Sequence, residues 1–214
     1  MPDAGESIAA EVDTPEPTEE EKKEPCKRIY LHAFRGDRST EFLVAFKRKI
    51  ADAKQHGLPG PSEVECLVYT GHVGLSFEAD SPILGFNPET GSDPIWLVFD
   101  KLKGTADVSK ASYPGRITDD TAVFDAAKQR GLTVVKTEYV YPESQYNAIK
   151  QQFDQHRAGT SLQYNFPGGS GDCNCATFPA QIGIPVPEAT GILKDYIPAM
   201  SSGPAKKQMG DCEG

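Results

Sequence analysis

The sequence has no long apolar run. No segment approaches the about 20 consecutive apolar residues that a membrane-spanning helix needs, so we expect no stable membrane insertion. The chain also does not open with a basic stretch and an apolar core, so we expect no secretory signal peptide. These absences favour a cytoplasmic location by default, with non-classical secretion as the alternative.

The chain also lacks an excess of basic residues. It has 22 Lys and Arg against 31 Asp and Glu, a formal net charge of −9, and no stripe rich in Arg or Lys. Binding to nucleic acid depends on a basic surface that displaces counterions from phosphates. The charge balance therefore argues against a nucleic-acid partner.

Cysteines are few for a disulfide scaffold. The 214 residues contain five, an odd number without framework spacing: Cys26, Cys66, Cys173, Cys175 and Cys212. A chain of this length buries enough surface, about 70%, to fold without covalent links, so we expect reduced thiols. Because Cys173 and Cys175 have no second Cys pair or nearby His, no metal site is predicted, and no cofactor is expected.

Composition divides the chain into three parts. Residues 1–26 are acidic, contain proline and no aromatic residue, and so cannot bury enough apolar surface to fold. Residues 27–200 have the apolar patterns of a single domain. Residues 201–214 are small and polar. We expect a disordered acidic tail, one catalytic domain and a flexible C-terminal tail.

Short apolar runs and helical periodicities alternate within the domain. Strands are predicted for six segments: Lys27–Ala33, Val64–Tyr69, His72–Phe77, Ile83–Phe86, Ile95–Phe99 and Leu132–Val140. Helices are predicted after three starting signals: Ser39-Thr40, Asp119-Asp120 and Pro142. Neighbouring strands clustered around helices are typical of an α+β fold with an antiparallel sheet packed against helices.

Two segments contain the residues of a candidate site. His72 opens an apolar strand directly behind Gly71, where a cleft could reach it. Far along the chain, a glycine-rich stretch leads through Cys173 and Cys175 into a predicted helix. A thiol in the first turn of a helix is stabilised as thiolate, and free backbone N–H groups there can hold an oxyanion. The pattern predicts a cysteine nucleophile.

Taken together, the two segments resemble the NlpC/P60 branch of papain-like thiol enzymes in circularly permuted form. The family pattern Tyr-x-Trp-Gly-Gly followed by Asp-Cys-Ser-Gly is similar to the stretches 164–169 and 172–175. Its Gly-Ile-x-Leu-Pro stretch resembles 183–187, and its His-Val-Gly-Ile-Tyr strand resembles 72–76. Here His72 precedes the Cys pair, the order of the permuted group that includes lecithin:retinol acyltransferase-like proteins.

The resemblance implies roles for particular residues. Its Asn-Cys form selects Cys175 as the nucleophile, whereas its Asp-Cys form selects Cys173; we favour Cys175, with His72 as the base. Tyr164 would help to hold the oxyanion. The third polar residue follows the His strand in the family, and Asn87 is the best side chain available there. Asp119-Asp120 is interpreted only as a helix start.

The function implied is a cysteine-dependent amidase or peptidase, a thiol hydrolase without cofactor. The family's substrates point to peptide amides, with cell-wall (peptidoglycan-type) peptides foremost. The enzyme would cleave them as a secreted antibacterial effector. Two alternatives stay open. One is a lipid acyltransferase or thioesterase that uses the same Cys and His, and the other is a binding module that has kept the fold without catalysis.

Overall fold

A computed structural model describes residues 23–103, 112–165, 173–186 and 205–213. Residues 1–22, most of the expected disordered tail, lie outside this description, as do the glycines between residues 166 and 172. Within the described ranges, every helix is too short or too polar to cross a bilayer.

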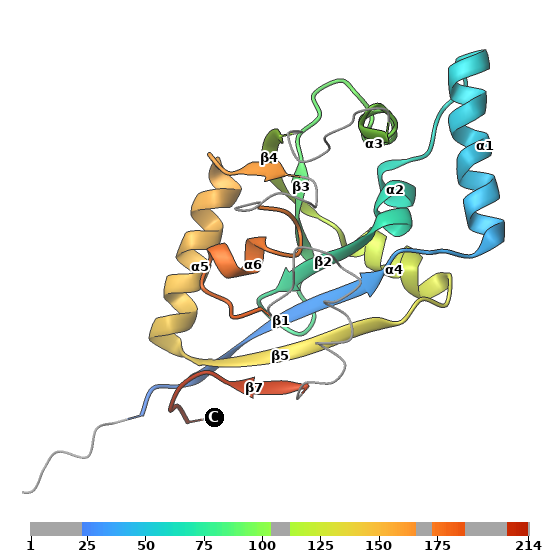
Figure 1. Cartoon of the computed structure of the whole chain (residues 1–214). Coiled ribbons are helices and arrows are strands. Elements are labelled where there is room, and N and C mark those ends of the chain that lie inside the picture. The colour runs from blue at the N-terminus through green and yellow to red at the C-terminus, as the bar shows by residue number, and fades with distance from the viewer. Residues whose placement is uncertain (1–22, 104–111, 166–172, 187–204, 214) are drawn as a thin grey trace, which may run out of the picture.

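The fold is α+β, built on a seven-stranded mixed sheet in the order β6-β4-β3-β2-β1-β5-β7 (Figure 1). All neighbouring strands are antiparallel except β5 and β7, which are parallel, so the predicted purely antiparallel sheet is wrong at this edge. The strands are β1 (Cys26–Arg35), β2 (Gly71–Ser76), β3 (Leu84–Pro88), β4 (Ser112–Asp119), β5 (Val134–Pro142), β6 (Gln163–Asn165) and β7 (Lys206–Gln208).

The three predicted helices form where their signals stand. Helix α1 (Thr40–His56) begins behind Ser39, whose side chain accepts from the Phe42 N–H, and ends at Gly57, which takes the left-handed conformation that favours glycine. The other two are α4 (Thr121–Gln129) and α5 (Glu143–Ala158).

Two predicted strands are helices instead. The apolar run after Ser62 forms α2 (Glu63–Thr70), which a reciprocal capping box between Ser62 and Glu65 starts. The second run forms α3 (Ile95–Lys103). Short apolar runs do not distinguish a buried strand from a buried helix by period alone.

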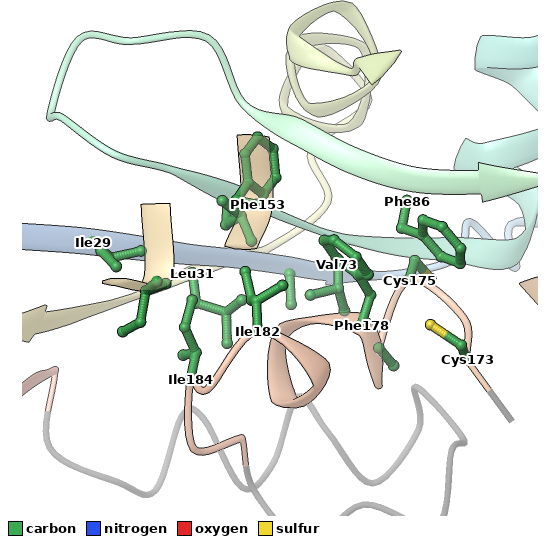
Figure 2. Packing of buried hydrophobic residues seen from close by; sticks show 14 of the residues in the cluster. Ile29, Leu31, Val73, Phe86, Phe153, Cys173, Cys175, Phe178, Ile182 and Ile184 are labelled. Atoms are coloured by element: carbon green, nitrogen blue, oxygen red, sulfur yellow. The ribbon is translucent and has the colours of Figure 1, made fainter. Parts of the chain in front are cut away.

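Apolar side chains pack on both faces of the sheet. Along β1, Ile29, Leu31 and Ala33 belong to a cluster covered by α5 and by the segment that contains Cys175 and the short helix α6 (Phe178–Gln181). Phe34 belongs to a second cluster, covered by α2 and α4, with α1 outside them (Figure 1). Figure 2 shows the first cluster, in which the α6 segment lies against the strands.

A disulfide joins the two ends of the described chain, Cys26 and Cys212, 186 residues apart in sequence. The expectation that all five thiols are reduced is therefore wrong for this pair, because β1, β5 and β7 lie side by side and bring the two cysteines together. Residues 205–213, part of the tail expected to be flexible, include β7, and the Cys26 N–H donates to the Glu213 carbonyl at 2.9 Å.

Candidate active site

His72 stands where two neighbouring strands separate. The β2–β3 ladder contains Gly74–Gly85 and Leu75–Leu84 and does not extend to His72 and Val73, although β3 continues to Pro88. The Val73 backbone N–H donates to the sulfur of Cys175 instead of to β3. The nucleophile candidate therefore occupies the place that a strand partner would otherwise fill.

Cys175 is held in a tight turn by the residues around it. The Asn174 side-chain oxygen accepts from the Ala176 N–H at 2.9 Å and the Thr177 N–H at 3.2 Å, while the Thr177 hydroxyl accepts from the Asn174 N–H at 2.9 Å. Phe178 then anchors the turn, because its ring stacks on Phe86 of β3 with 4.8 Å between centroids. Local hydrogen bonds and core packing together fix the thiol.

The predicted helix at Cys175 is shorter than expected. Helix α6 (Phe178–Gln181) has four residues and begins three residues after Cys175, which lies in the preceding turn. The macrodipole of a long helix therefore does not explain how this thiol is activated. Individual charges and hydrogen bonds around the sulfur take its place.

The surroundings of Cys175 stabilise its thiolate. Burial alone raises the pKa of the Cys175 thiol, but the positive charge of the neighbouring His72 more than offsets this and lowers the pKa below its usual value. The Val73 N–H and the Tyr164 hydroxyl act in the same direction. Burial likewise disfavours charged His72, yet the Cys175 thiolate and Asp120 raise its pKa. The favoured state is a thiolate–imidazolium pair.

The other side of the imidazole contacts a residue that the sequence did not reveal as functional. His72 is fully buried, and its Nε2 lies 2.7 Å from Oδ2 of Asp120, which is 3% exposed. Because Nε2 is occupied in this way, Nδ1 is the ring nitrogen left for the thiol; within the described structure, Nδ1 has no hydrogen-bond partner. The arrangement brings together a Cys–His–Asp triad.

Asp120 is thus more than the helix start predicted for it. Its side chain makes no cap hydrogen bond to α4, whereas the neighbouring Asp119 side chain accepts from the Thr121 N–H at 3.0 Å. The Asp120 backbone N–H donates to the Ile83 carbonyl at 2.8 Å, which holds the residue beside β3. Two acids stand where a helix start needs one, and this surplus was the only sequence signal for the role of Asp120.

Asn87, the predicted orienting residue, is fully buried beside the triad but reaches His72 only through Asp120. Its amide nitrogen donates to Asp120 Oδ2 at 2.8 Å and to the Thr118 hydroxyl at 2.7 Å. Thr118, which sequence reasoning missed, donates in turn to Asp120 Oδ1 at 2.7 Å.

Gly85 leaves the space in which His72 and Asp120 meet. A Cβ atom on this residue would lie 1.9 Å from Asp120 Oδ2 and 2.4 Å from His72 Nε2. No side chain fits there without separating the two. Sequence analysis saw this glycine only as part of a strand, because its role depends on β2 and β4 on either side.

Tyr164, to which the resemblance assigns a part in holding the oxyanion, lies beside Cys175. It is 7% exposed on β6, and its ring packs near Phe86 with 5.6 Å between centroids. Burial and the nearby Cys175 charge raise the pKa of Tyr164, so its hydroxyl keeps its proton. This hydroxyl donates to the Cys175 sulfur and accepts from the Cys175 backbone N–H, so two donors meet next to the thiol.

Cys173, the alternative nucleophile, has a different environment. Its backbone carbonyl accepts from the Asn165 N–H at 2.8 Å, which ties it to β6. Burial raises the pKa of the Cys173 thiol to about 12. Cys66, on the buried face of α2, has a pKa raised to about 12 in the same way. Of the three free thiols, only Cys175 is activated.

In the described part of the chain, no three His, Cys, Asp or Glu side chains gather as a metal site would require. Comparisons with protein-family models, with curated proteins and with solved structures find no match to this chain.

Proposed function

We propose that this chain is a cysteine-dependent hydrolase that cleaves amide bonds, with Cys175 as nucleophile, His72 as acid and base, and Asp120 as the residue that orients His72. The observation that carries the proposal is the buried arrangement in which the His72 ring lies between the Cys175 sulfur and Asp120 Oδ2. A buried thiolate–imidazolium pair is costly to maintain and is characteristic of catalysis.

The reaction would proceed in two stages. The Cys175 thiolate attacks the substrate carbonyl carbon, and the negative oxygen that forms is held by donors such as the Cys175 N–H and the Tyr164 hydroxyl. His72 then gives its Nδ1 proton to the leaving amine, and a thioester remains on the sulfur. A water molecule, deprotonated by His72, attacks the thioester and restores the thiolate.

The proposal includes the permuted papain-like fold. Three features support this architecture: a nucleophile next to a short helix, a histidine on a central strand, and a carboxylate at the end of another strand. In chain order His72 comes first, Asp120 second and Cys175 last. Since such triads are recognised by geometry and roles rather than by sequence order, this order is compatible with the same chemistry.

For the substrate we propose a peptide amide, with cell-wall peptides as the first class to test. The Cys26–Cys212 disulfide supports a site of action outside the reducing cytosol, because such bonds persist in oxidising compartments. Acyl transfer to an acceptor other than water would pass through the same thioester, so the products of the reaction distinguish the two activities.

Alkylation by iodoacetamide between pH 5 and 9, followed by mass spectrometry of each cysteine peptide, tests the activated thiol. We expect Cys175 to react quickly at pH 6, while Cys66 and Cys173 stay unmodified. In His72→Ala, Cys175 should react only at higher pH. Peptidoglycan fragments would then be digested with wild type and with Cys175→Ala and analysed for new amines. Slow reaction of Cys175, at the pH of an ordinary thiol, would refute the proposal.

A further inference from the structure

Two residues that touch no reacting atom surround the Asp120 carboxylate. Asn87 of β3 and Thr118 of β4 contact each other and both contact Asp120. Asn87 and Asp120 are both buried, so water does not compete for the hydrogen bond between them. Their hydrogen bonds decide how the carboxylate is oriented towards His72.

The direction of each hydrogen bond can be derived. The Asn87 amide must present Nδ2, because its carbonyl oxygen would face the negative Asp120 Oδ2 at 2.8 Å. Both Nδ2 hydrogens are then used, one on Asp120 and one on the Thr118 oxygen. A threonine hydroxyl has one hydrogen, which is directed to Asp120 Oδ1. All hydrogen bonds of this network therefore have a fixed direction, from Asn87 to Thr118 and from both residues to the Asp120 carboxylate.

The hydrogen bond between His72 and Asp120 also has the carboxylate as acceptor. Asp120 accepts one bond at Oδ1 and one at Oδ2 from the pair, and the His72 Nε2 at 2.7 Å completes the set as a third donor. Neutral imidazole carries one proton, so a proton on Nε2 leaves Nδ1 as an acceptor facing the thiol. The Asn87 Oδ1 oxygen has no partner in the described structure, in keeping with an amide orientation set by the carboxylate.

We propose that Asn87 and Thr118 are positioning residues that hold Asp120 as a hydrogen-bond acceptor and thereby keep the proton of neutral His72 on Nε2. The proposal rests on the proposed function, in which His72 is neutral once it has given its proton to the leaving amine and then takes a proton from water at Nδ1. Neither residue contacts Cys175 in this scheme, so both act through Asp120.

Thr118→Val is the first variant, since it removes the hydroxyl at nearly constant shape, and Thr118→Ser is the conservative variant that keeps it. Asn87→Ala removes the other donor. Ser76→Ala is the matched control, because Ser76 is buried on β2 and its hydroxyl lies 3.1 Å from the ring of a different histidine, His32. Circular dichroism and thermal melts establish that each variant is folded.

The first readout is the pH profile of Cys175 alkylation. We expect Thr118→Val to lower the rate at pH 6 about tenfold and to move the midpoint up by about one pH unit, with Asn87→Ala changing it in the same direction. Thr118→Ser should restore the profile, and Ser76→Ala should leave it as in the wild type.

The second readout does not depend on the nucleophile. In a Cys175→Ala background, nitrogen-15 spectra recorded at a pH above the pKa of His72 should show a single tautomer protonated at Nε2, and adding Thr118→Val should give a mixture. Folded Thr118→Val and Asn87→Ala proteins with the wild-type profile and a single tautomer would overturn the positioning proposal and leave the proposed function intact. An unreactive Cys175 in the wild type would instead overturn the proposed function.

Discussion

The two sides of the central strands differ in how completely they are paired. On one side, β1 pairs with β5 from Cys26–Pro142 to Phe34–Val134, and β7 extends the sheet to the disulfide between Cys26 and Cys212. On the other side, β2 pairs with β3 only at Gly74–Gly85 and Leu75–Leu84. The activated thiol lies at this second, interrupted side.

The difference shows how a sheet can supply stability and chemistry in separate places. Continuous pairing satisfies the backbone groups of β1 and β5 and leaves none for a ligand. Where β2 leaves β3, the Val73 N–H is released to the sulfur, and His72 and Asn87 gain room to contact Asp120. The predictions below alter one side at a time, from the largest expected effect to the smallest.

Replacing the nucleophile should have the largest effect. Cys175→Ala should abolish amide cleavage and all fast alkylation at pH 6, because the other free thiols have pKa values of about 12. Cys173→Ala is the control in the same segment and should retain both. Peptide release and labelled peptides are measured by mass spectrometry. Fast labelling that disappears with Cys173→Ala would transfer the nucleophile role to Cys173.

Gly85→Ala should disable the site although no triad residue is replaced. Its Cβ would lie 1.9 Å from Asp120 Oδ2, so His72 must separate from Asp120, and misplacement of about 1 Å can cost about 100-fold in rate. Overpacking should also cost about 1–3 kcal/mol of stability. Gly159→Ala is the matched control, since its Cβ would meet nothing within 4 Å. Equal activity of the two variants would contradict this account of Gly85.

Removing the disulfide should lower the stability of the fold and leave the reactivity of Cys175 unchanged. Cys26→Ser with Cys212→Ser should lower the free energy of unfolding by about 2–4 kcal/mol, chiefly because the unfolded chain regains freedom. Urea melts measure this loss, and the pH profile of Cys175 alkylation should stay unchanged. An altered profile would mean that the two sides of the sheet are coupled, contrary to the comparison above.

Lowering the pH should destabilise the part of the sheet formed by β1 and β5, because His32 of β1 becomes protonated. Burial, with a smaller contribution from Lys136, lowers the pKa of His32 to about 4 from 6.5, so the folded state resists its protonation. The stability due to neutral His32 is complete above pH 6.5 and is lost as the pH falls towards 4. Wild type should therefore lose about 2 kcal/mol between pH 7 and 5 from this group.

His32→Gln keeps a polar side chain without the titration. Urea melts at pH 7 and pH 5 should show a smaller loss for this variant than for wild type. If both lose the same amount, His32 is not the group responsible.

Local patterns were sufficient where a signal was complete within a few residues. The helix after Ser39 and the strand around His72 follow from caps and periodicity, whereas the helix predicted at Cys175 begins only at Phe178. The same patterns were insufficient for the apolar runs of α2 and α3, whose length suits either structure. The identity of the third polar residue was predicted as Asn87, one hydrogen bond away from the side chain that contacts His72.

What the chain encodes locally is therefore the presence of a candidate nucleophilic cysteine, a histidine and the elements that contain them. Only the tertiary structure decided that Asp120 contacts His72, that Gly85 leaves room for this contact, and that Cys26 meets Cys212. The reason is physical. Each of these contacts joins residues from strands distant in sequence, and the pairing of a sheet is set by which faces can be buried together, a property that no single segment possesses.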